Sequence, residues 1–251
     1  DVITAKIMKM KKNYGYARLM EILTPSKDRV EPRCRFHKQC GGCQIQALSY
    51  EKQLEYKKKK VLNNLTRIGG LSELPEFDLI GMEDAYCYRN KAQFPFGTDK
   101  NGEIVTGFYA GRTHSIISNT KCYLGVEENE QILEIILAHL KKYNIPAYDE
   151  QTGKGLLRHV LIRKGFTTKE LMVCLILNGT RMPEVNELVE QLVKIPGMTS
   201  ITINVNTKQT NVIMGQEMRS VWGQDYITDY IGNVKYQISP LSFFQVNPVQ
   251  T

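Results

Sequence analysis

The chain has 251 residues, 42% of them hydrophobic and 24% charged, which predicts a folded protein with an ample core and excludes a disordered chain. No apolar run approaches the ~18 residues that a membrane-spanning helix needs, and no signal-peptide pattern opens the sequence. The net charge of +7 is unevenly placed, because residues 1–70 hold 16 Lys and Arg against 6 Asp and Glu, whereas the remainder holds 17 against 20. Such one-sided charge favours a polyanionic partner, although a merely solvated basic face is the alternative.

Residues 1–30 alternate polar and apolar positions around a turn at residues 13–15, which predicts short strands. The segment that follows carries three cysteines, Cys34, Cys40 and Cys43, in the spacing C-x5-C-x2-C. Thiolates that converge in this way hold a metal or an iron–sulfur cluster. The spacing lacks the second close pair of a structural zinc site, so it favours a cubane cluster, with zinc as the alternative.

Three further cysteines are candidates for a fourth ligand. Cys122 lies in a polar, turn-prone segment before a predicted helix, which makes it the best candidate. Cys87 lies between two tyrosines and competes with it. Cys174 lies in an apolar run that predicts a buried strand, where a thiol is usually inert.

Residues 49–68 predict a helix that begins after Ser49, ends at Gly69 and carries four adjacent lysines at positions 57–60. Four adjacent lysines span more than one turn, so phosphate attraction and ordinary solvation both remain open. Residues 86–116 predict a hairpin with basic and aromatic side chains on its first strand, and residues 126–143 an amphipathic helix.

From residue 155 the pattern predicts a succession of strands with one helix inserted. The predicted strands are 156–164, 170–177, 199–205 and 210–215, and the predicted helix is 183–194. The fold class expected from this order is α+β, with a central antiparallel sheet and helices on one face. At the end of the chain, Asn247 followed by Pro248 predicts the start of a new helix, which indicates a larger domain cut within its first helix.

Several motifs in the right order resemble the bacterial RNA (uracil-5-)-methyltransferases, the group of RumA, RlmCD and TrmA, and most of all their ribosomal-RNA members. They are Cys34-x5-Cys40-Gly-Gly-Cys43-Gln, Tyr88-Arg-Asn-Lys91, Gly107-Phe-Tyr109, Leu157-Arg-His-Val160 and Ser242-Phe-Phe-Gln-Val-Asn247. The resemblance implies a [4Fe-4S] cluster on Cys34, Cys40, Cys43 and Cys122. It also implies that Gln245 contributes to the site of S-adenosylmethionine and the target base.

The resemblance also implies a division into domains. Residues 1–32 look like the later strands of an OB-like TRAM domain, and residues 33–236 like a central domain with the cluster and an RNA-facing surface. Residues 237–251 look like the start of a Rossmann-like methyltransferase domain, on which helix 49–68 is expected to pack. That domain, which binds most of the S-adenosylmethionine and carries the attacking cysteine and the general base, is expected to be absent beyond its first residues.

We therefore expect a cytoplasmic, monomeric protein that contributes RNA recognition and a cluster to a methyltransferase forming 5-methyluridine in 23S-type ribosomal RNA, this chain alone being inactive. The alternative is a stand-alone metal-containing RNA-binding module without catalysis. RNA contacts are expected from basic and aromatic side chains, namely Lys57, Lys58, Arg89, Lys91, Phe94, Arg158, Arg163 and Phe243.

Overall fold

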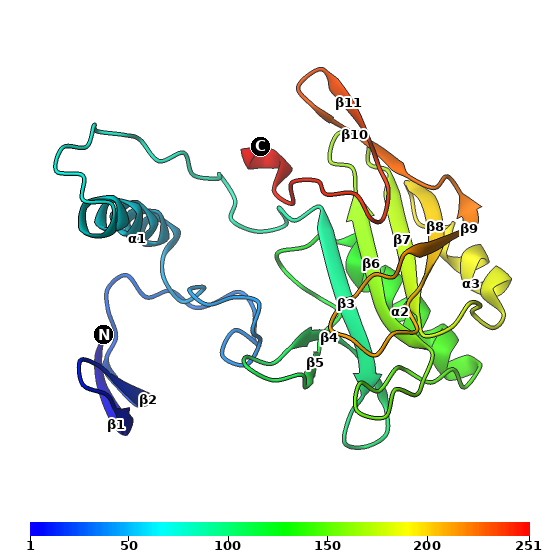
Figure 1. Ribbon diagram of the computed structural model, residues 1–251, viewed down its shortest axis with the longest axis horizontal. Coiled ribbons are helices and arrows are strands. Elements are labelled where there is room, and N and C mark those ends of the chain that lie inside the picture. The colour runs from blue at the N-terminus through cyan, green and yellow to red at the C-terminus, as the bar shows by residue number, and fades with distance from the viewer. The chain divides into compact units, whose positions relative to one another are not determined.

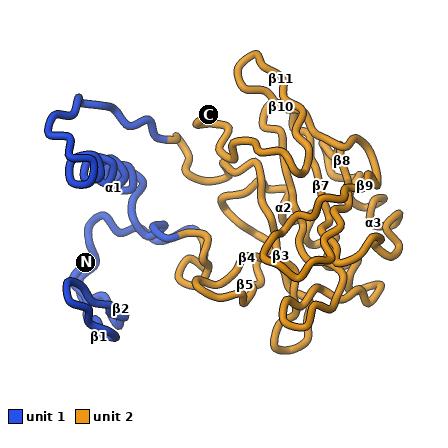
Figure 2. Tube along the Cα trace, in the orientation of Figure 1, with its two compact units in different colours: residues 1–33, 44–81 blue, residues 34–43, 82–251 orange.

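The computed structural model describes residues 1–251 and divides into two compact units (Figure 2). Unit 1 comprises residues 1–33 and 44–81, and unit 2 comprises residues 34–43 and 82–251. This division differs from the predicted boundaries after residues 32 and 236, which were placed by motifs rather than by compactness. The cysteine-bearing residues 34–43 therefore belong to a different unit from the residues on either side of them.

Unit 1 holds a hairpin and a helix. Strands β1 (Val2–Met10) and β2 (Gly15–Thr24) pair antiparallel with each other only. Helix α1 (Tyr50–Asn63) continues into a π-helical turn, η1 (Asn64–Ile68), so the predicted helix of residues 49–68 is confirmed apart from its first residue. An isolated two-stranded hairpin is marginal in water, and nearly every residue of β1 and β2 is exposed. Neither α1 nor any other helix has the length and apolar character needed to cross a membrane.

Unit 2 is built on a seven-stranded sheet in the order β5-β4-β3-β6-β7-β8-β9 (Figure 1). Its strands are β3 (Lys91–Thr98), β4 (Ile104–Tyr109), β5 (Ile116–Ser118), β6 (Leu157–Lys164), β7 (Leu171–Leu177), β8 (Met198–Val205) and β9 (Glu217–Gly223). A separate hairpin joins β10 (Ile227–Ile231) to β11 (Val234–Ile238). The helices are α2 (Glu128–Lys142), α3 (Val185–Leu192) and the short 3-10 turn η2 (Pro248–Gln250).

The sheet is mixed, so the predicted antiparallel sheet is wrong. Strands β7 and β8 pair in parallel, with Val173 opposite Ile201, while the other neighbours are antiparallel. The parallel pairing follows from the connection between β7 and β8, since this connection contains α3 and crosses over one face of the sheet. A strand–helix–strand crossover returns the chain in the same direction, whereas antiparallel neighbours need only a tight turn.

Both faces of the sheet are covered. On one face, α2 and α3 pack their apolar side chains against alternate strand residues, including Phe94, Val160 and Val173. On the other face, a smaller cluster joins Leu161, Met172 and Ile176 to Ile227, Ile238 and Phe244, which come from the β10–β11 hairpin and the segment after it. Arg158, His159 and Arg163 of the central strand β6 are therefore buried.

The predicted strand of residues 210–215 is wrong, because asparagine side chains form hydrogen bonds with the backbone groups of this segment. Nδ2 of Asn206 donates to the carbonyls of Val212 and Ile213 at 2.7 and 2.9 Å. Oδ1 of Asn204 accepts the N–H of Gly215 at 2.7 Å, and its Nδ2 donates to the carbonyl of Gly215 at 2.9 Å. The segment is consequently a loop fixed to β8, and the edge strand is β9 instead.

Candidate functional site

The residue before β3 binds the segment that follows β11. The N–H of Asn90 donates to the carbonyl of Val246 at 3.0 Å, and its side-chain Nδ2 donates to the carbonyl of Gln245 at 2.8 Å. The carbonyl of Asn90 accepts the N–H of Lys164 at 2.9 Å. Asn90 is only 4% exposed, so these bonds are shielded from water. One buried asparagine thus joins the end of β6 to residues 239–247, which we call the carboxyl-terminal segment.

A buried arginine fixes the start of the same segment. Nη2 of Arg163, in β6, donates to the carbonyls of Pro240 and Ser242. Burial lowers the pKa of this guanidinium to about 10, which still leaves it charged at neutral pH. Hydrogen bonds from a charged donor are stronger than neutral ones. The segment is therefore held at two points, by Arg163 of β6 and by Asn90 next to β3.

Side chains alternate along the middle of the carboxyl-terminal segment. Phe244 is 8% exposed and packs into the second core cluster, where its ring lies 5.7 Å from that of Tyr236. Phe243 is 86% exposed, and Gln245 is exposed as well. An extended chain points successive side chains to opposite sides. Anchoring Phe244 consequently presents an aromatic ring and an amide to solvent, two residues apart.

Basic side chains lie beside this segment. Lys91 pairs directly with Arg163 across β3 and β6, on the face of the sheet away from α2 and α3. Burial lowers the pKa of Lys91, and the neighbouring charges of Arg163 and Arg89 lower it further. Like charges on opposed residues repel, so an anion placed here would relieve an unfavourable interaction. Arg89 is half-buried in the same stretch.

Three of the predicted RNA contacts are corrected by the structure. Phe94 is 0% exposed and packs against the ring of Phe108, so it cannot stack on a base. Arg158 is 4% exposed and donates to the carbonyls of Asn206, Lys208 and Thr210. Arg163 is 3% exposed and binds the carboxyl-terminal segment as described. These side chains support the fold around the site instead of facing an RNA.

The remaining predicted contacts divide between the two units. Lys57 is exposed on α1, and Lys58 is half-buried there with its Nζ 5.2 Å from the ring centre of Phe77. Arg89, Lys91 and Phe243 belong to unit 2 with Gln245.

The cysteine-bearing loop, residues 34–43, is bound to the end of β4. Cys40 forms a bridge with Ala110, the N–H of Gly41 donates to the carbonyl of Tyr109 at 2.9 Å, and the N–H of Gly111 donates to the carbonyl of Gln39. A side chain at Gly41 would lie 3.2 Å from the Tyr109 carbonyl, so a glycine is what permits this close approach.

Cys122 lies in the same unit as the cysteine-bearing loop, and two thiols of that loop affect its pKa. Burial raises the pKa of Cys122, and the proximity of Cys40 and Cys34 raises it further. Opposing this, the Cys122 sulfur accepts the backbone N–H groups of Leu124 and Gly125, as metal-bound thiolates commonly do. No three side chains converge closely enough to hold a single metal ion. Two thiols of the loop close enough to Cys122 to shift its pKa, together with its hydrogen-bonded sulfur, fit a multi-iron cluster, which spreads its ligands more widely than one zinc ion does.

Backbone hydrogen bonds connect the Cys122 turn to the carboxyl-terminal segment. The N–H groups of Cys87 and Arg89 donate to the carbonyls of Tyr123 and Leu124 at 2.8 and 2.9 Å. The next residue, Asn90, then binds Gln245 and Val246. The motif Tyr88–Lys91 contains Asn90 but does not reveal its role, because its partner lies 155 residues away.

No family model matches the chain. An uncharacterized RNA methyltransferase of Clostridium tetani is 44% identical over 252 residues, which cover 100% of this chain and 54% of that protein. Uncharacterized RNA methyltransferases of Clostridium acetobutylicum and Listeria monocytogenes are each 45% identical and are 55% covered.

One solved structure shares the fold. The tRNA (uracil-54, C5)-methyltransferase of Pyrococcus abyssi, crystallised with S-adenosyl-L-homocysteine, matches with a TM-score of 0.73 at 24% identity. The match covers 98% of this chain and 54% of that protein. The prediction that only the first residues of a methyltransferase fold are present is therefore wrong, since nearly the whole chain, its seven-stranded mixed sheet included, aligns with a methyltransferase.

The sequence relatives share one description and match this chain from end to end. The chain spans about half the length of the curated relatives that it matches. In keeping with the motifs identified from the sequence, the chain is thus similar over its whole length to proteins named RNA methyltransferases, at 44–45% identity.

Proposed function

We propose that this chain binds RNA as part of an S-adenosylmethionine-dependent RNA (uracil-5-)-methyltransferase that forms 5-methyluridine in ribosomal RNA of the 23S type. The observation that carries the proposal is the carboxyl-terminal segment, in which Phe243 and Gln245 are exposed while Arg163 and Asn90 hold their backbone. An exposed aromatic ring stacks on an unpaired base regardless of sequence, and an amide both donates to and accepts from the edge of a base. Together they suit a uracil taken out of its stack.

Charge beside the segment supports the same proposal. Lys91 and Arg89 provide cations next to Gln245, where the phosphates that flank a target nucleotide would lie. S-adenosylmethionine supplies the methyl group for C5 of uracil. Within this chain, Gln245 would orient the uracil and contribute to the cofactor site, while Phe243 would stack beside it.

Cys34, Cys40, Cys43 and Cys122 would hold a [4Fe-4S] cluster in the reducing cytoplasm. The binding of the cysteine-bearing loop to the end of β4 and the hydrogen bonds to the Cys122 sulfur support this assignment. A cluster with four protein ligands has no open iron, so its part is to fix the Cys122 turn from which the backbone contacts run to Asn90.

A methyl-transfer assay tests the proposal. Full-length protein is incubated with labelled S-adenosylmethionine and unmodified 23S ribosomal RNA or transfer RNA, and 5-methyluridine is mapped in the product. We expect transfer to 23S RNA, at least a tenfold loss with Gln245→Ala or Phe243→Ala, and little loss with the nearby exposed control Leu241→Ala. Methylation of transfer RNA alone would contradict the substrate, and no methylation of either RNA would contradict the activity. That this chain alone is inactive stays a prediction, which the same assay tests on residues 1–251.

A further inference from the structure

The cysteine-bearing loop and the chain around the β4–β5 connection carry cations but no carboxylates. Residues 34–43 and 104–126 contain no Asp or Glu, and their four basic side chains are Arg35, Lys38, Arg112 and Lys121. The rest of unit 2, residues 82–103 and 127–251, holds 15 Lys and Arg against 17 Asp and Glu. The positive charge of unit 2 is therefore concentrated on this one part of it.

Three of these cations are exposed and have no carboxylate partner. Arg35, Lys38 and Arg112 take part in none of the ion pairs of the structure. Lys121 differs from them, because its Nζ lies 3.8 Å from the carboxylate of Glu130. Exposed cations without a carboxylate neighbour are available to an anion from outside the chain.

One backbone hydrogen bond brings two of the three cations together. The N–H of Gly111 donates to the carbonyl of Gln39 at 3.0 Å. Lys38 directly precedes Gln39 and Arg112 directly follows Gly111, so the two cations come from adjacent stretches of chain. Arg35 comes three residues before Lys38 in a run of tight turns, which places both on one side. Like charges this close repel each other, and a bound anion would remove the repulsion.

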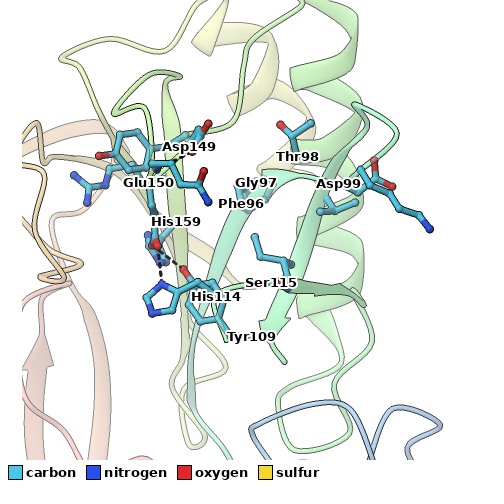
Figure 3. Close-up of a pocket in the computed structure, with 16 residues that line it drawn as sticks. Phe96, Gly97, Thr98, Asp99, Tyr109, His114, Ser115, Asp149, Glu150 and His159 are labelled. Atoms are coloured by element: carbon cyan, nitrogen blue, oxygen red, sulfur yellow. Dashed lines mark hydrogen bonds and ion pairs between the residues drawn. The ribbon is translucent and has the colours of Figure 1, made fainter. Parts of the chain in front are cut away.

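The loop that carries Arg112, residues 110–115, is also fixed from its other side. The carboxylate of Glu150 accepts the hydroxyl of Tyr109 at 3.2 Å and contacts Nδ1 of His114 at 2.6 Å (Figure 3). The rings of Tyr109 and His114 lie 5.2 Å apart between these contacts. A loop held at both ends loses little conformational freedom when it binds a partner.

Arg112 has a backbone conformation that favours glycine. Its φ is 64°, in the left-handed region where a Cβ atom is unfavourable. Residues kept in such conformations cluster at sites of function. Because the Arg112 side chain makes no ion pair within the protein, a partner outside the chain accounts for an arginine here better than the fold does.

We propose that Arg35, Lys38 and Arg112 bind phosphates of an RNA backbone. The proposal rests on the RNA-binding function proposed above and adds a contact surface outside the carboxyl-terminal segment. Phosphate contacts position an RNA without reading its sequence, whereas contacts to a base select it. The three cations would thus orient the RNA, and Phe243 and Gln245 would select the target base.

Filter binding of the 251-residue chain to a labelled, mixed-sequence RNA of about 20 nucleotides tests the proposal, at salt concentrations of about 50 to 200 mM. Lys38→Glu combined with Arg112→Glu should lower the affinity at least tenfold. The slope of log affinity against log salt should fall by about 1.4, since each phosphate contact of a single strand contributes about 0.7. Lys141→Glu combined with Arg181→Glu makes the same change at exposed positions of unit 2 and should leave the slope unchanged.

Two single variants separate the Arg112 side chain from its backbone. Arg112→Gly suits the positive φ, so it should be at least as stable as the wild type and yet bind RNA about three- to tenfold more weakly. Arg112→Lys keeps the charge and should bind within about twofold of the wild type. A loss of stability in Arg112→Gly with unaltered RNA binding would overturn the proposal, because the arginine would then serve the fold.

Iron and sulfide analysis of the same variants tests the competing role of the cations, which is to offset negative charge on a cluster held by the cysteines. We expect the Lys38→Glu and Arg112→Glu double variant to contain as much iron as the wild type. Loss of iron together with loss of RNA binding would overturn the proposal, as would an equal fall in slope in the control variant.

Methyl transfer is measured separately on the full-length protein. RNA binding that depends on the three cations, without methylation, would contradict the proposed function alone. Methylation by the wild type, with RNA binding unaffected by the double variant, would contradict this inference alone.

Discussion

Asn90 and Gln245 are 155 residues apart in the chain, and the Nδ2 of the first donates to the carbonyl of the second at 2.8 Å. The bond is made to the backbone, which leaves the Gln245 side chain exposed. Asn90 therefore acts as a positioning residue, because it determines where the amide of Gln245 can lie without touching a ligand itself.

Asn90→Ala should lower the rate of methyl transfer at saturating RNA by about tenfold while changing RNA affinity little, because it loosens the backbone of the target-base site. The cost in stability should be about 1 kcal/mol. The control is Asn178→Ala, which removes two similar side-chain bonds to the carbonyls of Gly153 and Gly155. Steady-state kinetics and chemical denaturation measure both effects, and an equal loss of rate in the two variants would exclude a specific role for Asn90.

Arg163→Met should destabilise the carboxyl-terminal segment, because two carbonyls lose a charged donor. We expect a loss of about 2–4 kcal/mol in unfolding free energy and faster hydrogen exchange in residues 239–247. Arg158→Met is the matched control, since it removes the donor to the carbonyls of Asn206 and Lys208. In Arg158→Met, hydrogen exchange should be faster in the loop that begins at residue 206. The same pattern of hydrogen exchange in both variants would argue against separate anchoring roles for the two arginines.

His159 should make stability depend on pH. Its pKa is lowered from 6.5 to about 4 in the folded state by burial, so the unfolded chain binds the proton more readily. The stabilisation is thus fully present above pH 6.5 and is lost as the pH falls from 6.5 towards 4, by up to about 3 kcal/mol. Urea denaturation between pH 4.5 and 7.5 should show a shallower slope for His159→Phe than for the wild type. Identical slopes would mean that other groups cause the dependence.

Cys122→Ser should lower the iron and sulfide content of protein purified without oxygen, because it removes one of four proposed cluster ligands. Cys174→Ser is the control, since burial raises the pKa of Cys174 to about 12 and the side chain lies in the core between strands. We expect four iron atoms and four sulfides per chain in the control and the wild type. A colourless wild-type protein with one tightly held zinc ion would contradict the cluster.

Charge reversal at Lys57 and Lys58 should weaken RNA binding and reduce its salt dependence. If each lysine contacts one phosphate, the slope of log affinity against log salt should fall by about 1.5 in the double Lys→Glu variant. Lys141→Glu combined with Lys235→Glu makes the same change of charge at exposed positions in unit 2 and should leave the slope unchanged. A similar reduction in both variants would indicate a general charge effect.

The elements of the fold that depend on local pattern could be predicted from the sequence. Helices α1 and α2 and strands β3, β4, β6, β7 and β8 lie close to the predicted ranges, since caps and hydrophobic periodicity are local properties. The loop of residues 210–215 was mistaken for a strand because nothing local reveals that Asn204 and Asn206 bind its backbone. The helix predicted between β7 and β8 is compatible with parallel pairing of these two strands, but the antiparallel sheet was predicted instead.

The site was predicted less well than the elements around it. Phe94 was expected to face RNA, although alternation along β3 places it with Ala92 and Phe96 on the helix-covered face. Arg158 and Arg163 were treated as exposed because an arginine usually is, and only the coverage of both sheet faces explains why they are buried. Predicting the role of Asn90 requires knowledge of a contact across 155 residues, which a single sequence does not contain.

The chain passes between its two units three times, at residues 33–34, 43–44 and 81–82 (Figure 2). A protease that cuts after Gly81 would therefore leave unit 1 joined to residues 82–251 only through the noncovalent contacts of the cysteine-bearing loop, such as its backbone hydrogen bonds to Tyr109 and Gly111.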